Sequence, residues 1–429
     1  MIQTNAKNEL TLDIDALSYG PFGIGRHQGK AVMIPKTAPG DTVAARIVED
    51  KERYSVGEIV RMIKPSSLRQ VPPCPYVAHC GGCPWQHVRY EAQLLAKQKS
   101  VEDALRRIGK LEGFELKPII PSPFSYNYRR RIRLQRDGSK RLGFFTSFSH
   151  HLVEIDRCLI ADDKLNAIIE RLRRWSEDLI TDIEHLEVVT GDEPNQIVVV
   201  GQSASGFNSR DSSICERLLE EDHLIAGLIV RGRDWRRTWG EGAISVVPED
   251  GLCVRVDGDV FTQVNSKGNR QLLNQLLTAA EFNRDDRVLE LYSGAGNFTH
   301  SIARRVGDIV AVEGYRPAVE SGQHSAQAIG ITNIHWICSP VPAALAQLKK
   351  QRQRFSKIVL DPPRTGAKGI DRDLAALGAE KILYISCNPT TLARDLAAVA
   401  KQGYSLRTVQ PVDLFPHTFH VEAIATLVR

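Results

Sequence analysis

The chain has 429 residues, of which 42% are hydrophobic, and a formal net charge of +5. This length exceeds what one ordinary hydrophobic core serves, so we expect two or three domains. No uninterrupted apolar run reaches about eighteen residues and the first residues are polar, which predicts a cytoplasmic protein with no membrane partner. The net charge is too small to establish a polyanionic partner by itself, and no feature predicts an obligate protein partner.

Residues 9 to 63 alternate apolar and polar residues in short runs, separated by turns that contain glycine and proline. Runs such as Leu10-Thr-Leu-Asp-Ile and Lys30-Ala-Val-Met-Ile are typical of half-buried strands. Several short strands in succession predict a small β-barrel over residues 1–65. The segment resembles a TRAM domain, an OB-like barrel that is common on RNA-modifying enzymes.

The rest of the chain divides into two further predicted units. Residues 66–260 contain a helical pattern from 90 to 108, strand-like runs and a charged helix near 165–179, which predicts a central α+β domain. Residues 261–429 alternate strands and helices, which predicts a Rossmann-like, doubly wound, mostly parallel sheet. We expect strands of this sheet at 287–291, 308–313, 357–361 and 381–386. The whole chain is thus predicted to be a multidomain α/β protein.

A nucleotide-binding loop is predicted after the first of these strands. There the chain reads Ser293-Gly-Ala-Gly-Asn-Phe-Thr, whose glycines permit a tight turn and close approach to a ligand. The next strand ends in Glu313, about 20 residues further on, where a carboxylate can accept hydrogen bonds from ribose hydroxyls. A nicotinamide dehydrogenase would show the same pair. The later motif Asp361-Pro-Pro-Arg favours a methyltransferase, because a carboxylate held by two prolines at a strand end is a familiar element of methyltransferase active sites.

A thiol and a carboxylate complete the predicted site. Cys387 directly follows a strand, which puts its thiol at the edge of the sheet where ligands bind, and Glu422 begins the predicted final strand. Such a pair suits methylation of uracil at carbon 5. Carbon 5 is too weak a nucleophile to take a methyl group until a thiolate adds to carbon 6. A base must then remove the proton at carbon 5. We therefore predict Cys387 as nucleophile and Glu422 as base.

These motifs resemble the RNA 5-methyluridine methyltransferase family. The resemblance is carried by Leu291-Tyr-Ser-Gly-Ala-Gly-Asn-Phe-Thr, Asp361-Pro-Pro-Arg, Ser386-Cys-Asn-Pro and Phe415-Pro-His-Thr-Phe-His-Val-Glu, and the barrel segment extends it over nearly the whole chain. It implies transfer of a methyl group from S-adenosylmethionine to carbon 5 of a uridine in RNA, through a covalent cysteine adduct. By the same resemblance the cofactor pocket is lined by Gln263, Tyr292, Gly294, Asn297, Glu313 and Asp361.

Three cysteines, Cys74, Cys80 and Cys83, lie close together in a glycine-containing segment. In a reducing compartment such spacing indicates metal binding or catalysis rather than disulfides. Zinc usually takes paired Cys-x-x-Cys motifs, so three close cysteines and a distant fourth, Cys158, favour an iron–sulfur cluster, with zinc as the alternative. The spacing also resembles the cluster-bearing branch of the family, which implies a 4Fe-4S cluster with a structural role.

A basic stripe between Arg129 and Arg141 contains Arg130 and Arg131, which we predict to contact RNA phosphates. A solvated strand face explains the stripe equally well when it is taken alone. Because a uridine must leave its stack to reach Cys387, we expect an unstacked or loop uridine as target. The resemblance implies 23S ribosomal RNA as the substrate, with transfer RNA as the alternative.

Two rival functions belong to other classes of protein. The first is a DNA or small-molecule methyltransferase on the same sheet; cytosine-5 enzymes also use a cysteine, but theirs typically sits in a Pro-Cys element on a different strand. The second is a non-catalytic RNA-binding iron–sulfur protein that retains a cofactor pocket. The presence of both Cys387 and Glu422 argues against it.

Overall fold

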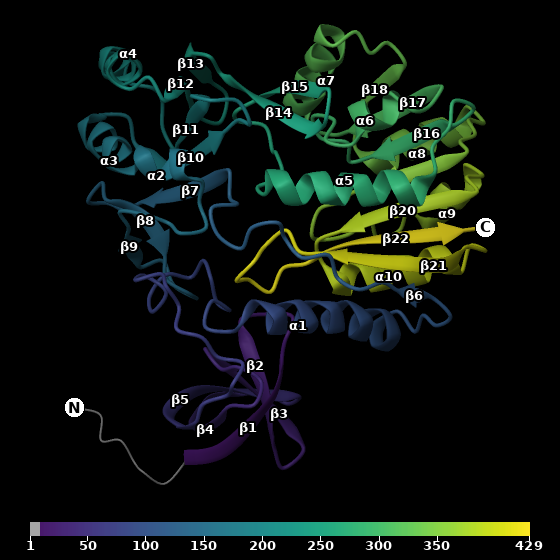
Figure 1. Ribbon diagram of the computed structural model, residues 1–429. Coiled ribbons are helices and arrows are strands. Elements are labelled where there is room, and N and C mark those ends of the chain that lie inside the picture. The colour runs from purple at the N-terminus through teal and green to yellow at the C-terminus, as the bar shows by residue number, and fades with distance from the viewer. Residues whose placement is uncertain (1–8) are drawn as a thin grey trace.

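The computed structural model describes residues 9–429, so the first eight residues of the predicted barrel segment lie outside the described residues. Figure 1 shows a barrel in purple at the bottom, a blue-to-teal sheet at the upper left and a green-to-yellow sheet at the right. The helix α1 (Tyr90–Asp103) runs between the barrel and the right-hand sheet. Within residues 9–429 no helix has the length and apolar character needed to cross a membrane.

The predicted N-terminal barrel is confirmed as a closed barrel with the strand order β1-β2-β3-β5-β4. Apolar residues at alternate positions, such as Leu12 and Ile14, point inward and are almost fully buried, as expected for strands with one face on a core. The strands are β1 (Glu9–Leu17), β2 (Phe22–His27), β3 (Lys30–Pro35), β4 (Thr42–Asp50) and β5 (Tyr54–Lys64).

The central region is built on a seven-stranded sheet with the order β13-β12-β11-β10-β7-β8-β9. Its strands are β7 (Arg131–Arg136), β8 (Leu142–Phe145), β9 (Leu152–Glu154), β10 (Ile183–Thr190), β11 (Ile197–Ser203), β12 (Ile225–Arg231) and β13 (Arg236–Gly240). Its helical segments are α2 (Asp163–Ala167), α3 (Ile169–Asp178), η3 (Ser209–Asp211) and α4 (Ser212–Glu221). A separate hairpin of β14 (Ala243–Glu249) and β15 (Leu252–Asp257) follows and leads toward the C-terminal sheet.

The C-terminal region forms an eight-stranded sheet with the order β18-β17-β16-β19-β20-β22-β21-β6. Its strands are β16 (Arg287–Leu291), β17 (Asp308–Glu313), β18 (Ile334–Cys338), β19 (Lys357–Leu360), β20 (Lys381–Ser386), β21 (Ser405–Val412), β22 (Glu422–Val428) and β6 (Glu115–Leu116). Its helices are α5 (Ser266–Ala280), α6 (Thr299–Ala303), α7 (Arg316–Ala328), α8 (Val341–Lys350), α9 (Asp371–Ala376) and α10 (Pro389–Ala400). The predicted doubly wound sheet is therefore confirmed, and its order reverses between β16 and β19, where such sheets bind ligands.

Two features of this sheet were not predicted. The strand β22 runs antiparallel between β20 and β21, with Ser386 opposite Ala423 at one end of the β20 pairing. The short strand β6 adds to the far edge by pairing with β21. It follows α1 and the π-helical turn η2 (Ala104–Ile108), which packs against α10. The segment from α1 to β6, which the sequence places in the central region, thus packs against the C-terminal sheet.

A buried ion pair fixes α1 to the loop that precedes β22. The Nζ of Lys97 lies 2.6 Å from Oδ1 of Asp413, and both side chains are fully buried. Tyr90 donates a second hydrogen bond to Asp413, and Lys97 also donates to the carbonyl of Phe415. Removing one member of such a pair leaves the other charged and buried, so the pair strongly restricts where the loop can lie.

Candidate active site

The ends of four neighbouring strands bring the predicted site residues to one edge of the C-terminal sheet. The nucleotide loop follows β16, Glu313 ends β17, Asp361 follows β19 and Cys387 follows β20. Parallel strands place their carboxyl ends together, which is why residues far apart in sequence meet there. Glu422 reaches the same edge because β22 is antiparallel, so that its first residue lies where the others end.

The loop after β16 is held in a strained, defined turn. Tyr292 and Gly294 have positive φ angles of 62° and 56°, a region that is costly for the tyrosine and open to glycine. The carboxylate of Glu313 accepts hydrogen bonds from the backbone N–H of Gly294 at 3.0 Å and of Tyr315 at 2.7 Å. Glu313 therefore ties the loop to the end of β17 while remaining at the position predicted to meet a ribose.

Most of the predicted cofactor residues line a single pocket. Five of them, Gln263, Tyr292, Gly294, Asn297 and Asp361, lie in its wall. Glu313 does not line this pocket and acts on it through the glycine loop. The sequence did not predict the rest of the lining, which contains Arg130, Phe261, Asn269 and apolar residues of the hairpin β14–β15.

The cofactor pocket is shaped by pairing within its own wall. The amides of Asn297 and Asn269 exchange two hydrogen bonds, at 2.8 Å and 3.1 Å. Asn269 lies on α5, whose first turn is capped by the side chain of Asn265. Asn265 also donates to the carbonyl of Leu414. The pocket, α5 and the loop before β22 are thus joined by hydrogen bonds and form one rigid arrangement.

The predicted nucleophile and base lie side by side. Because Ser386 pairs with Ala423, the residues that follow and precede them, Cys387 and Glu422, share one position at the sheet edge. Glu422 is only 4% exposed. Burial raises the pKa of Glu422 and of Asp361, and the charge of Asp361 raises that of Glu422 further.

Cys387 is held at the junction of β20 and α10. Asn388 caps α10 by accepting hydrogen bonds from the backbone N–H of Thr390 and Thr391, so the turn that bears the thiol is fixed from its helix side. Burial raises the pKa of the Cys387 thiol to about 12, and the negative charges of Glu422 and Asp361 add to this, whereas Arg364 opposes it. The thiol is therefore protonated in the ligand-free protein at neutral pH.

The structure corrects the prediction that Arg130 and Arg131 contact RNA phosphates. Their residues are only 5% and 8% exposed. Arg130 donates to the carbonyl of Thr190 and lies 3.4 Å from Asp192, and Arg131 pairs with Glu187 at 2.7 Å. Neither guanidinium reaches RNA on the surface without breaking these bonds. Sequence spacing revealed the cations but not the acids that neutralise them.

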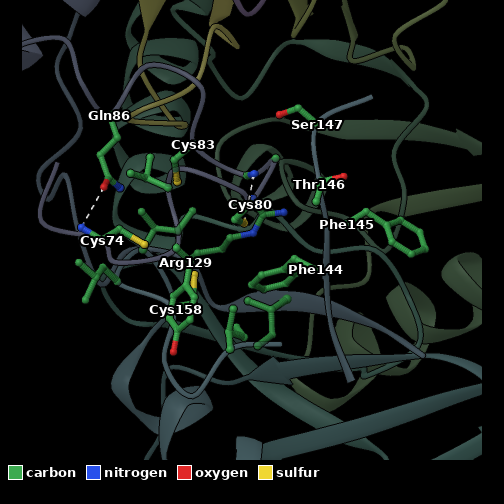
Figure 2. A pocket seen from close by; sticks show the side chains of 18 of the residues that line it. Cys74, Cys80, Cys83, Gln86, Arg129, Phe144, Phe145, Thr146, Ser147 and Cys158 are labelled. Atoms are coloured by element: carbon green, nitrogen blue, oxygen red, sulfur yellow. Dashed lines mark hydrogen bonds between the residues drawn. The ribbon is translucent and has the colours of Figure 1, made fainter. Parts of the chain in front are cut away.

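The four clustered cysteines meet at a second cavity, at the junction of the barrel linker and the central sheet. Cys74, Cys80, Cys83 and Cys158 line this cavity of about 420 Å³, and Figure 2 shows their side chains around it together with Arg129. Across residues 9–429, no group of three or more His, Cys, Asp and Glu side chains has the arrangement needed to hold a single metal ion. The predicted metal site is therefore not confirmed.

The fold and the arrangement at the sheet edge define a methyltransferase of the S-adenosylmethionine-dependent α/β class. Comparison with known families narrows this class: the tRNA (Uracil-5-)-methyltransferase family matches residues 89–429, and the TRAM domain family matches residues 6–60. The chain belongs to the RNA uracil-C5 methyltransferase family, and it is an RNA uracil-C5 methyltransferase with an N-terminal TRAM domain.

Single proteins that resemble this chain are also RNA uracil-C5 methyltransferases by name. The chain is 32% identical to the 23S rRNA (uracil(1939)-C(5))-methyltransferase RlmD of Enterobacter sp. (strain 638), over 98% of both chains. It is 33% identical to the RlmD protein of Mannheimia succiniciproducens, over 97% of this chain and 95% of that one. The crystal structure of Pyrococcus abyssi tRNA (uracil-54, C5)-methyltransferase with S-adenosyl-L-homocysteine is similar to this chain, with a TM-score of 0.75 at 23% sequence identity. The match covers 98% of this chain and 100% of the Pyrococcus abyssi chain, and it supports the fold.

The raised pKa of Glu422 predicts a stabilising substitution. A carboxyl whose pKa is higher in the folded state binds its proton more tightly there. The stability that this proton contributes is fully present below the ordinary pKa of 4.5, and it is lost as the pH rises through the raised pKa. Glu422→Gln carries no such proton. We expect the melting temperature of Glu422→Gln to exceed that of the wild type at pH 9 and the difference to shrink toward pH 5.

The control for this measurement is Glu52→Gln, which changes an exposed glutamate of the barrel and should leave the melting temperature unaltered at every pH. A difference between Glu422→Gln and the wild type that is the same at pH 5 and pH 9 would show that Glu422 is an ordinary carboxylate.

Proposed function

We propose that Cys387 and Glu422 carry out the methylation of uracil by covalent catalysis. The observation that supports this most directly is the strand pairing that sets Glu422 beside Cys387, with Asp361 on the adjacent strand end. A protein that only bound RNA would have no use for a half-buried thiol beside the buried Glu422 and the half-buried Asp361, since placing such groups together costs stability. The rival non-catalytic function is therefore the weaker proposal.

The proposed reaction proceeds through a covalent adduct between Cys387 and the uracil. The Cys387 thiol passes its proton to solvent water and its sulfur forms a bond to carbon 6 of the uracil, while the carbon 5–carbon 6 π electrons move toward the O4 oxygen as an enolate. Carbon 5 then takes the methyl group from the sulfonium of S-adenosylmethionine, so the carbon–sulfur bond of the donor breaks and its electron pair stays on the sulfur of neutral S-adenosylhomocysteine. Glu422 removes the proton from carbon 5, the double bond re-forms, and the Cys387 sulfur leaves as a thiolate. The raised pKa of Glu422 suits it as the proton acceptor, because a stronger base gains more from the transfer.

We assign the methyl donor to the pocket described above. S-adenosylmethionine supplies a methyl group on a positively charged sulfonium, and its demethylated product was bound in the Pyrococcus abyssi enzyme. In this proposal Glu313, at the end of β17, accepts hydrogen bonds from the ribose hydroxyls, and Gln263 and Asn297 present amides in the pocket wall. Asp361 lines this pocket and is close enough to Cys387 for its charge to raise the pKa of the thiol, so we assign it contacts with both the donor and the uracil.

The substrate we propose is a uridine of 23S ribosomal RNA. The relatives named above that exceed 30% identity over almost their full length carry this activity in their names, whereas the tRNA enzyme shares only 23% identity and supports the fold alone. The TRAM barrel supplies a domain type that is common on RNA-modifying enzymes. A uridine in a loop or an unstacked site is expected, because the target base must enter the pocket at Cys387.

We also propose that the cysteine cavity holds a 4Fe-4S cluster. Four thiols around one cavity are the donor set of such clusters, which spread their ligands over several irons instead of one ion. The backbone N–H of Gly82 donates to the sulfur of Cys80 at 3.4 Å, and hydrogen bonds to sulfur of this kind are typical of cluster sites. The proposed chemistry transfers no electron, so Cys74, Cys80, Cys83 and Cys158 would hold the cluster as a structural brace.

The first test of the mechanism separates Cys387 from Glu422. Cys387→Ala should neither methylate RNA nor form a covalent complex, because the adduct at carbon 6 cannot arise. Glu422→Gln should methylate the base once and then stall, so a methylated, denaturation-resistant protein–RNA adduct should accumulate. Gel electrophoresis after denaturation, with radiolabelled methyl groups, measures both outcomes. Methylation by Cys387→Ala, or normal turnover by Glu422→Gln, would contradict the assigned roles.

The second test concerns the substrate. RNA from a strain that lacks the gene should accept methyl groups from the purified enzyme at a uridine of 23S ribosomal RNA, and mapping of the labelled position identifies it. Labelling of transfer RNA, with none in 23S ribosomal RNA, would show that the alternative substrate is the true one.

The third test concerns the cluster. Protein purified without oxygen should contain about four irons per chain, and Cys80→Ser should lose them together with part of its thermal stability. Cys253→Ser is the matched control, because Cys253 is an exposed cysteine of β15 outside the cavity. Stoichiometric zinc without iron in the wild type, or full iron content in Cys80→Ser, would contradict the proposal.

A further inference from the structure

The TRAM barrel reaches the proposed active site through one side chain. The turn between β1 and β2 carries Tyr19, whose hydroxyl donates a hydrogen bond of 2.8 Å to the backbone carbonyl of Cys387. The tyrosine ring packs edge-on against Phe419, with 5.7 Å between ring centroids. Phe419 belongs to the segment that leads into Glu422. A residue of the barrel thus contacts Cys387 itself and the segment that precedes Glu422.

The carbonyl that Tyr19 contacts lies outside the regular hydrogen bonding of its neighbours. The pairing of β20 with β22 ends at Ser386, one residue earlier. The helical hydrogen bonding of α10 begins with the carbonyl of Asn388, which accepts from the backbone N–H of Leu392. Cys387 is therefore the link between strand and helix, and its peptide group needs a partner from elsewhere.

Tyr19 is itself held in place by other segments. The neighbouring Gly20 accepts a hydrogen bond of 3.1 Å from the indole N–H of the buried Trp85. The backbone N–H of Trp85 donates to the carbonyl of His417 at 3.0 Å. Burial raises the pKa of Tyr19, and a negative charge on Cys387 raises it further, so the hydroxyl keeps its proton and remains a donor. The tyrosine is a fixed contact that the barrel presents to the turn of Cys387.

We propose that Tyr19 is a positioning residue of the catalytic centre, whose hydroxyl fixes the backbone of Cys387 and thereby the direction of the thiol. This inference rests on the proposed role of Cys387 as nucleophile. It makes the barrel a part of the active site as well as a domain that binds RNA. Attack on carbon 6 requires a defined approach of the sulfur, and small losses of alignment at a reacting atom reduce rates markedly.

The test is Tyr19→Phe, which keeps the ring against Phe419 and removes only the hydroxyl. At saturating RNA and S-adenosylmethionine, the single-turnover rate of methyl transfer and the rate of covalent trapping on 5-fluorouridine RNA should both fall about three- to tenfold, the loss that one hydrogen bond carries. The dissociation constants for RNA and S-adenosylmethionine should not change. Tyr54→Phe is the matched control, because Tyr54 begins β5 of the same barrel and should leave both rates unaltered.

A second variant separates positioning from stability. Ile14→Val removes one methyl group from the barrel core, where Ile14 is almost fully buried, and should lower the melting temperature without slowing either rate. If Tyr19→Phe cannot be purified folded, Ser18→Ala replaces it, because the hydroxyl of Ser18 donates to the carbonyl of Phe22 and closes the turn that carries Tyr19.

The outcomes are distinct. Wild-type rates in Tyr19→Phe, or a slowing that Ile14→Val reproduces at an equal loss of melting temperature, would overturn the positioning role. A change in RNA affinity with an unchanged rate at saturation would also overturn it and make Tyr19 an RNA contact. If the wild type itself forms no adduct on 5-fluorouridine RNA, the proposed function fails and not the inference about Tyr19 alone.

Discussion

The arrangement of the proposed active site depends on the antiparallel insertion of β22 between β20 and β21. Parallel strands bring only their carboxyl ends to the ligand edge, so a reversed strand is needed to bring an amino end there as well. The register that pairs Ser386 with Ala423 places Glu422 next to Cys387. A slip by one residue would turn the side chain of Glu422 to the opposite face of the sheet. The pairing of β22 with its two neighbours therefore sets the chemistry as well as the fold.

Placing Glu422, Asp361 and Cys387 close together costs stability, and the loop that precedes β22 is held by a buried ion pair. The charges of Glu422 and Asp361 raise the pKa of the Cys387 thiol, and the charge of Asp361 raises that of Glu422, so each of these ionised groups opposes ionisation of its neighbour. The loop before β22 is held in place by the buried pair of Lys97 and Asp413. Since both charges of that pair are satisfied, the pair specifies the position of the loop even where it adds little net stability. The fold thus uses one buried ion pair to hold the loop that leads into Glu422, whose carboxyl is partly offset by the charge of Arg364.

The sequence predicted what depends on local pattern. Alternation of strands and helices indicated the doubly wound sheet, and the strand ends at Glu313, Asp361 and Cys387 were located correctly. It could not predict contacts between distant segments. From the sequence, Arg131 was predicted to be a surface cation, whereas in the structure β10 places Glu187 beside it. The contact of Tyr19 with Cys387 joins residues that are 368 positions apart in the chain. No periodicity or motif encodes such a contact, because each partner is ordinary in its own segment.

The proposed cluster at the cysteine cavity would be connected to the proposed active site through Trp85. Cys83 lies two residues before Trp85, the buried residue that bonds both Gly20 of the barrel turn and His417 of the loop before β22. Holding Cys83 therefore holds Trp85, and with it the two segments that meet at Cys387. A cluster without any redox function would still affect methyl transfer through this route. Trp85 thus joins the cysteine segment to both the barrel turn and the loop before β22.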